Sequence, residues 1–232
     1  VLCFCYIRRL KKIKIDVVFQ NELFVIINKP HGLLVHRTTT SDEYTLRDYL
    51  VENFNVNGIG ENNREGIVHR LDRVTSGLIL CPINLDAFNQ LKDDFKKRKI
   101  KKSYKAIVQG SLNSDSGEIN LPLIHSVKNR KKREVNKNGK EAITKYKTIS
   151  KGNMYSLLDI DLITGRNHQI RAHLEYLNKP IVNDVLYGAK INPLLDKGTI
   201  CLQSYKLEFE LFKKEYKFSI NEPDYFSSIM KM

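Results

Sequence analysis

Short apolar runs separated by turn-forming residues dominate this chain of 232 residues, and they constrain its fold more than any other feature. The first run, residues 22–28, ends in a Lys-Pro-His-Gly segment, which predicts a strand followed by a turn. Tyr104, Ala106 and Val108 alternate with polar neighbours, as in a strand with one buried face. Further strands are predicted over 76–81, 142–149, 155–162, 199–210 and 215–220.

Helical spacing of apolar residues occurs in fewer places. It predicts helices over 86–98 and 166–177, and a shorter one over 45–53. No internal repeat and no linker of domain-separating composition interrupts this pattern, so it predicts a single α+β domain over residues 15–228. Residues 1–14 do not begin with Met and are interpreted as an N-terminal extension or the remnant of missing upstream sequence.

Composition excludes several classes of protein. No apolar run approaches the roughly 18 residues of a membrane-spanning helix, and the apolar opening is followed, not preceded, by positive charges, unlike a signal peptide. The four cysteines have no paired spacing of a zinc site or disulfide framework, and His168 and His173 are five apart, unlike a zinc helix. We therefore expect no metal, no cofactor and no membrane association, and a cytoplasmic protein, or an organellar one if the source is a eukaryote.

The excess positive charge of the chain is concentrated in two stretches. Of the formal net charge of +13, residues 92–105 carry eight Lys or Arg against two Asp, and residues 128–147 carry nine against two Glu. The remaining residues are neutral in sum. Charge gathered in this way is typical of a surface that binds a polyanion, because each neutralised phosphate releases a counterion. The partner predicted by this pattern is nucleic acid.

Residues 69–80, His-Arg-Leu-Asp-Arg-Val-Thr-Ser-Gly-Leu-Ile-Leu, place one carboxylate between two arginines and ahead of a strand-like run. Cations on both sides of Asp72 favour its charged form, which suits a nucleophile or a charge stabiliser better than a proton donor. A solvated loop Asp that accepts backbone N–H groups is the alternative.

This string closely resembles the H-R-L-D-x-x-[ST]-[ST]-G-L signature of the RluA-type pseudouridine synthases. Three further segments are similar to motifs of that family in the same order: residues 28–36 to N-K-P-x-G-x-x-V-H, residues 102–106 to K-x-Y-x-A, and residues 164–173 to T-G-R-x-H-Q-I-R-x-H. Departures are Pro-Ile-Asn at 82–84, where the family usually has Ala-Lys-Asn, and Asn183 where it usually has Gly. The resemblance covers roughly residues 15–226.

The resemblance implies the pseudouridine synthase fold, a mixed and mostly antiparallel sheet with flanking helices and a central RNA-binding cleft. It also implies isomerisation of uridine to pseudouridine in structured RNA without a cofactor. By motif match, Asp72 is the catalytic residue, Tyr104 stacks on the target base, and Arg171 pairs with Asp72, with Arg166 as its rival. The carboxylate either adds to the uracil ring or assists departure at the ribose, and the sequence leaves both routes open.

Residues expected to bind RNA come from the motifs and from the basic stretches. By match to the family, Arg70 fills the stack that the target base leaves. Helical spacing places His168 and Arg171 on one face of the helix predicted over 166–177, with Arg166 at its start, where the helix dipole favours anions. The complete predicted set is Arg70, Lys102, Arg130, Lys131, Lys132, Arg133, Arg166 and His168.

Local features favour large-subunit ribosomal RNA as the substrate, with tRNA, or both RNAs, as the alternative. Many members of the family carry an N-terminal S4-like domain, and the short segment before the first strand predicts that this chain lacks it. A non-catalytic RNA-binding or ribosome-assembly factor on the same fold is the alternative from another class, although retention of Asp72, Tyr104 and Arg171 argues against it. We expect a monomer with no obligate protein partner.

Overall fold

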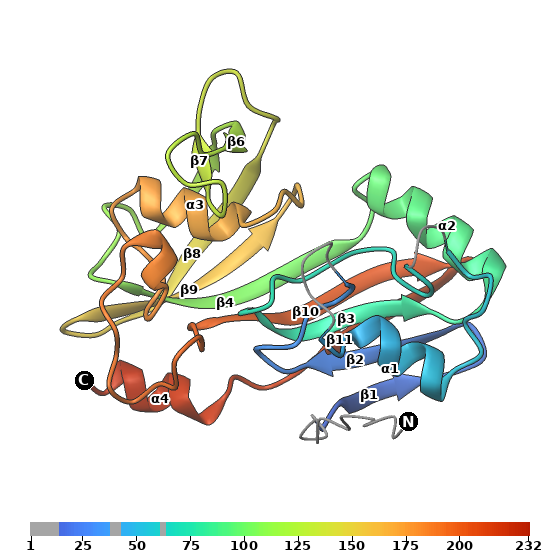
Figure 1. The fold of residues 1–232 in the computed structure, drawn as a ribbon. Coiled ribbons are helices and arrows are strands. Elements are labelled where there is room, and N and C mark those ends of the chain that lie inside the picture. Colours follow the sequence, from blue (N-terminus) through green and yellow to red (C-terminus); the bar gives the residue numbers. More distant parts are fainter. Residues whose placement is uncertain (1–13, 38–42, 61–63) are drawn as a thin grey trace, which may run out of the picture.

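The fold is built on a curved, mostly antiparallel sheet (Figure 1). The computed structural model describes residues 14–37, 43–60 and 64–232, so the expected N-terminal extension lies almost wholly outside the described residues. The strands follow the order β1-β2-β3-β10-β4-β9-β8-β5, with β11 paired to β10. Among the strands of the described residues, only β3 and β10 of this sheet pair in parallel. The strand bounds are β1 Asp16–Gln20, β2 Phe24–Lys29, β3 Ser76–Pro82, β4 Lys101–Gln109, β5 Ser116–Asn120, β8 Ile143–Lys151, β9 Tyr155–Leu162, β10 Leu202–Leu211 and β11 Lys214–Ser219.

Helices and one hairpin cover this sheet. The hairpin, β6–β7, lies in Figure 1 on the same side of the sheet as α2, at the other end of the view. No helix among the described residues is long and apolar enough to cross a membrane. The bounds are α1 Leu46–Asn53, α2 Leu85–Lys96, α3 Gln169–Tyr176, the 3-10 turn η1 Val185–Tyr187, α4 Asp224–Met230, β6 Leu123–His125 and β7 Arg133–Val135.

The run in β2 is apolar throughout because both of its faces are covered. Phe24 and Ile26 pack in the core formed with α2, β10 and β11, while Val25 and Ile27 pack in the core that includes α1. All four side chains are fully buried. Burial of alternate residues in opposite layers is what a continuous apolar strand predicts. The core of the α1 side continues under β4, β9, α3 and α4.

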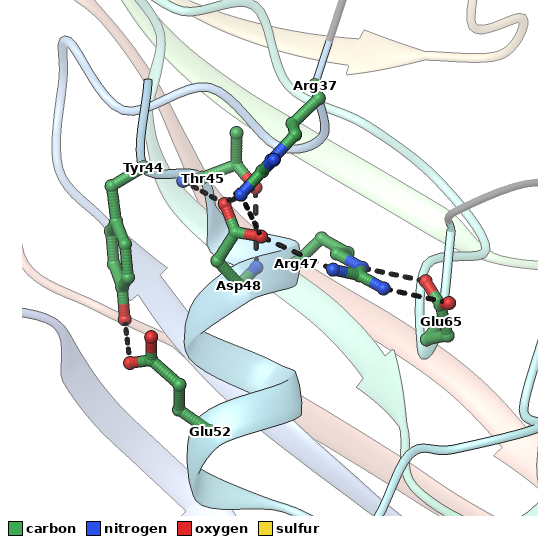
Figure 2. Close-up of polar contacts among 7 residues, drawn as sticks. All are labelled: Arg37, Tyr44, Thr45, Arg47, Asp48, Glu52 and Glu65. Atoms are coloured by element: carbon green, nitrogen blue, oxygen red, sulfur yellow. Dashed lines mark hydrogen bonds and ion pairs between the residues drawn. The ribbon is translucent and has the colours of Figure 1, made fainter. Parts of the chain in front are cut away.

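The start of α1 is fixed by polar contacts (Figure 2). Thr45 is the N-cap and forms a reciprocal capping box with Asp48. The Asp48 carboxylate also pairs with Arg37 and Arg47 at 3.3 Å, and Arg47 makes a two-fold contact with Glu65 at 2.8 and 2.9 Å. These contacts tie the segment after β2 to α1 and to the loop that leads toward residues 69–75.

The predicted elements are present, and the mixed α+β fold is confirmed, with one change that concerns the site. The helix predicted over 166–177 begins only at Gln169, because His168 has a left-handed backbone with φ of 54°. The Gln169 side chain accepts from the Arg166 N–H at 2.9 Å and from the Thr164 hydroxyl at 2.7 Å, which holds 164–168 as a turn. The prediction that Arg166 opens the helix was therefore wrong.

Candidate active site

Asp72 lies on a loop that immediately precedes β3. A buried lysine holds this loop in place. The Lys29 ammonium is fully buried and donates to the carbonyls of Pro30, Leu33 and Arg73 at 2.8, 3.0 and 3.4 Å. Gly32 N–H donates to the same Arg73 carbonyl at 2.7 Å. Burial lowers the pKa of Lys29 to about 7, against the opposing effect of the Asp72 charge. The turn after β2 and the Asp72 loop are thus held as one unit.

The start of the same loop is fixed by His69. Its Nε2 accepts the N–H of Leu80 at 2.8 Å, and its ring stacks on Phe95 of α2 with centroids 4.5 Å apart. Burial, with a smaller effect of the Lys102 charge, lowers the pKa of His69 to about 3, so the ring is neutral at physiological pH. The first residue of the signature string therefore serves to attach the loop to β3 and α2.

Two carboxylates share the guanidinium of Arg171. Its Nε and Nη2 donate to the two oxygens of Asp184 at 2.7 and 2.9 Å, and its Nη1 approaches Oδ2 of Asp72 at 3.4 Å. Arg171 and Asp184 are buried, whereas the Asp72 side chain keeps 14% of its surface exposed. Burial opposes the charge of Arg171, yet the two carboxylates prevail and raise its pKa. Arg171 thus stays a cation and faces Asp72 from the protein side.

A second chain of contacts reaches Asp72 through His168. His168 Nε2 lies 3.9 Å from Oδ2 of Asp72, and its Nδ1 lies 2.9 Å from the hydroxyl of Tyr187. Burial, as the largest effect, lowers the pKa of His168, which favours the neutral ring. The Tyr187 hydroxyl also accepts the N–H of Arg133 at 2.9 Å, and its ring lies 4.8 Å from the Arg171 guanidinium. Tyr187 thus connects the β6–β7 hairpin to both neighbours of Asp72.

Tyr104 lies on the other side of Asp72, on β4 opposite Ser204 of β10. Its side chain is 5% exposed, and burial raises its pKa far above the ordinary value, with the Asp72 charge acting in the same direction. Tyr104 and Asp72 line one cavity, together with the apolar side chains of Leu71, Leu162, Ile170 and Leu202. A neutral phenol, an apolar wall and a carboxylate therefore meet in one small cavity.

A basic groove opens beside this cavity. Arg70 and Tyr104 line both, and the groove, of about 440 Å³, is further lined by Lys92, Lys96, Arg98 and Lys102. These four cations belong to the first of the two basic stretches, residues 92–105, and the rest of the groove is lined mostly by residues 68–70 and 162–166. Burial, and to a lesser degree Arg98, lowers the pKa of Lys102 to about 8. The groove is suited to a phosphate backbone that leads toward Asp72.

The structure separates the arginines that surround Asp72 in the sequence. Arg73 points outward to an exposed pair with Glu43, and Arg70 lies exposed at the junction of the cavity and the groove. Arg166 donates through Nε to the carbonyl of Glu141 at 2.8 Å, so Arg171, and not its rival, contacts Asp72. The cation beside Asp72 is thus supplied by a distant segment.

The predicted basic cluster divides into two pairs. Arg130 and Lys131 are exposed, whereas Lys132 is half-buried, pairs with Glu175 of α3 at 2.9 Å and lies 4.9 Å from the Tyr187 ring. Arg133 is half-buried, and its backbone N–H is bonded to Tyr187. The first pair faces solvent, whereas the second holds the hairpin on α3 through Lys132 and on η1 through Arg133.

The sequence assigned no chemical role to three residues that organise the site, Lys29, Asp184 and Tyr187, although Lys29 was expected to shape the sheet edge near the cleft. All three fall within or beside family motifs, but their spacing alone does not show that they meet Asp72 or its partners. Asn183, the departure from glycine, has φ of 66° and donates to the Thr199 carbonyl at 2.6 Å. Asn tolerates this left-handed conformation better than most residues, so the turn that presents Asp184 is retained.

The chain is similar to known proteins of one family. A family model described as RNA pseudouridylate synthase matches residues 23–176. The ribosomal large subunit pseudouridine synthase D of Borreliella burgdorferi is 38% identical over 218 residues, which are 92% of this chain and 67% of that protein. An RNA pseudouridine synthase of Aquifex aeolicus is 35% identical over 94% of this chain and 73% of its own length.

Among solved structures, human RNA pseudouridylate synthase domain containing 4 superposes with a TM-score of 0.73 at 23% identity, covering 91% of this chain and 90% of that one. The fold is therefore that of a pseudouridine synthase domain. The family match extends over all the residues that line the cavity described above except Leu202. The chain belongs to the RNA pseudouridylate synthase family and is an RNA pseudouridine synthase, an isomerase that modifies RNA.

Proposed function

We propose that this enzyme converts uridine to pseudouridine in large-subunit ribosomal RNA, with Asp72 as the nucleophile. The observation that carries the proposal is the position of Asp72: its carboxylate lies 3.4 Å from the buried Arg171 guanidinium, in a cavity that it shares with Tyr104. Among the described residues that line this cavity, Asp72 is the only one with a carboxylate side chain.

The reaction is a balanced isomerisation. The N1–C1′ glycosidic bond breaks, the uracil turns, a C5–C1′ bond forms, and the proton on C5 is finally replaced by one on N1. Asp72 as an anion can add to the uracil ring or to C1′ of the ribose, and it is released unchanged in either route. Both routes require a charged, aimed carboxylate. The Arg171 guanidinium supports the orientation of the carboxylate, because it faces Oδ2 of Asp72 at 3.4 Å and is itself fixed by Asp184.

Tyr104 is proposed to pack on the uracil in the cavity and to act late in the reaction. Its phenol remains protonated because burial raises its pKa, so it presents a neutral face and a hydroxyl to the base. Removal of the C5 proton follows formation of the C–C bond. The protonated Tyr104 hydroxyl can take up this proton only by passing on its own, and the released Asp72 carboxylate, which lines the same cavity, is the acceptor. Arg70, exposed at the mouth, is positioned to replace the extruded base in the RNA stack.

Large-subunit ribosomal RNA is proposed as the substrate because the relative from Borreliella burgdorferi, named as a ribosomal large subunit pseudouridine synthase, is similar to almost the whole of this chain. The basic groove beside the cavity supports a structured, polyanionic substrate. We further propose that the catalytic domain, over residues 15–228, acts as a monomer.

Tritium release tests the nucleophile. Large-subunit ribosomal RNA transcribed with uridine tritiated at C5 loses the label to water when the C5 proton is exchanged. Asp72→Asn is expected to abolish release while RNA affinity, measured by filter binding, changes less than about three-fold, because the amide cannot act as a nucleophile but keeps the shape. The matched control is Asp115→Asn, which alters a surface pair with Lys151 at the far edge of the sheet and should leave release unchanged. Release by Asp72→Asn at the rate of the wild type would remove Asp72 from this role.

Pseudouridine mapping tests the substrate. Total RNA from cells that express the protein or the Asp72→Asn variant is mapped at single-nucleotide resolution. New pseudouridines confined to large-subunit ribosomal RNA are expected with the wild type alone. Sites found only in tRNA would overturn the substrate assignment and leave the assignment of Asp72 intact.

A further inference from the structure

A second cavity, of about 550 Å³, adjoins the candidate active site on the side away from Tyr104. It shares Asp72, His168 and Arg171 with the first cavity, so these three side chains form a common wall. None of the roles proposed above for the isomerisation uses this space. Its volume falls within the range of sites that hold a nucleotide-sized ligand, roughly 300–1,000 Å³.

The outer wall of this cavity is apolar and partly open to solvent. Val185 and Ile191 are 58% and 74% exposed, although both are aliphatic, and they lie with Val74, Leu186 and Ile200 around one space. Large aliphatic side chains gathered at an exposed site mark a surface that binds a partner with an apolar face.

Asn183, a buried polar residue that lines this cavity, already has its side-chain hydrogen bonds satisfied within the protein. The Asn183 amide donates to the Thr199 carbonyl at 2.6 Å, and its carbonyl oxygen accepts the N–H of Asn192 at 3.0 Å. The side chain is 5% exposed and has little capacity to bond a ligand. Away from the wall shared with the first cavity, a ligand is therefore held mainly by buried apolar area.

The rim of the cavity is positively charged. Lys131 and Lys197 line it, both are exposed, and neither forms an ion pair with any residue in the described part of the chain. Lys131 belongs to the second basic stretch and Lys197 to the loop before β10. An occupant with an apolar face and a negatively charged linkage matches this combination, and a nucleotide within an RNA strand has both.

We propose that this cavity binds the base of a nucleotide directly adjacent to the target uridine, extruded together with it. The inference rests on the proposed function. Because the two cavities share the Asp72 wall, neighbouring nucleotides of one strand can occupy both, with their phosphates near Lys131 and Lys197. Recognition mainly by apolar area favours a purine over a pyrimidine, since a purine buries more surface.

Removal of apolar area tests this site kinetically. Ile191→Ala and the double variant Val185→Ala/Ile191→Ala should lower kcat/KM for tritium release from large-subunit ribosomal RNA, by about tenfold in the double variant. The dependence of RNA affinity on salt should keep the slope of the wild type, because no charge is removed. Ile149→Ala is the matched control, since Ile149 is an exposed isoleucine on β8, is 47% exposed and lines neither cavity; it should behave as the wild type.

Ile191 lies on an exposed loop, so its truncation leaves the core intact and the single variant remains interpretable if the double variant folds poorly. Values of kcat/KM for both variants equal to that of the control would overturn the proposal. They would leave the surface to another occupant, such as an apolar peptide.

A binding measurement separates this inference from the proposed function. The probe is a hairpin RNA whose loop carries one uridine with 2-aminopurine on one side or the other. Binding of the Asp72→Asn enzyme should raise the fluorescence of 2-aminopurine on one side, because the base leaves its stack, and the Ile191→Ala substitution in that background should reduce the rise.

Unchanged fluorescence with the label on both sides would overturn the inference even if the wild type releases tritium. Conversely, a wild type that releases no tritium but shows the fluorescence rise would overturn the proposed ribosomal substrate and retain this site. The two failures are therefore distinguishable.

Discussion

Arg171 illustrates how single residues set the charge balance of this site. A guanidinium that is 4% exposed requires a counter-charge, and Asp184 supplies it with two short contacts, which leaves Nη1 to face Asp72. Asp184 is itself 1% exposed, and both of its oxygens are occupied by Arg171 even though it lines the second cavity. Its effect on the reaction is therefore exerted through Arg171, as a positioning residue.

Asp184→Asn should lower kcat for tritium release by at least tenfold and leave the KM for RNA nearly unchanged, because the guanidinium loses its counter-charge without loss of an RNA contact. Urea denaturation should show destabilisation of about 3 kcal/mol, as expected when one partner of a buried pair is neutralised. Glu43→Gln, which alters the exposed pair with Arg73, is the control and should cost less than about 1 kcal/mol. A rise in KM at constant kcat would contradict the positioning role.

Lys102 predicts a pH dependence for RNA binding. Its pKa is lowered to about 8 by burial, so the side chain is charged below pH 8 and loses its charge as the pH rises through that value. RNA affinity at fixed salt should therefore fall between pH 7 and pH 9, whereas Lys102→Met should bind more weakly at pH 7 and show little further loss. Equal pH profiles for the two proteins, measured by filter binding, would show that Lys102 does not contact RNA.

At the scale of elements, the parallel contact between β3 and β10 decides where the Asp72 loop ends. Ser76 and Gly77 pair with Gln203 and Ser204, and a Cβ added at Gly77 would lie 2.2 Å from the Ser204 carbonyl oxygen. Gly77 also has φ of 108°, which other residues rarely adopt. Glycine therefore permits the close approach of two strands directly beneath the cavity.

Gly77→Ala should destabilise the protein by about 3 kcal/mol or more, because backbone must move to admit the methyl group. Gly165→Ala is a matched control: its nearest neighbour would be Lys102 Nζ at 3.9 Å, an ordinary contact, and its φ is not left-handed. Thermal unfolding of both variants checks this, and equal melting temperatures would show that β3 and β10 can separate without cost.

At the scale of the whole molecule, the two basic stretches lie on either side of Asp72. Residues 92–105 line the groove beside Tyr104, and Lys131 of the second stretch lines the cavity beyond Arg171. Part of the first stretch belongs to α2 and part of the second to the β6–β7 hairpin, and Figure 1 shows these two elements on the same side of the sheet. An RNA that bridges the two passes over the Asp72 loop.

Salt dependence should distinguish the two pairs of the hairpin cluster. Arg130→Ala/Lys131→Ala should reduce the slope of log affinity against log salt by about 1.5, as expected when two phosphate contacts are lost. Lys132→Met should change the slope less, since its ammonium already pairs with Glu175, and should lower kcat because it supports the Tyr187 ring. Equal slope changes for the double and the single variant would show that Lys132 is free to bind RNA in solution.

The sequence by itself determined the local elements, the concentration of charge and the identity of the family, because these depend on spacing along the chain. It identified Asp72, Tyr104 and Arg171 as candidates, but through motif resemblance. Their distances were decided only by tertiary structure, which brings residues 72 and 171 together across 99 positions of sequence. The sequence places Arg70 and Arg73 next to Asp72, but in the structure Arg171 is the arginine that contacts Asp72. Successive side chains on a turn point in different directions. The same folding moved Asp184 and Tyr187 into the site and created the second cavity, since burial and shared contacts arise only when distant segments pack.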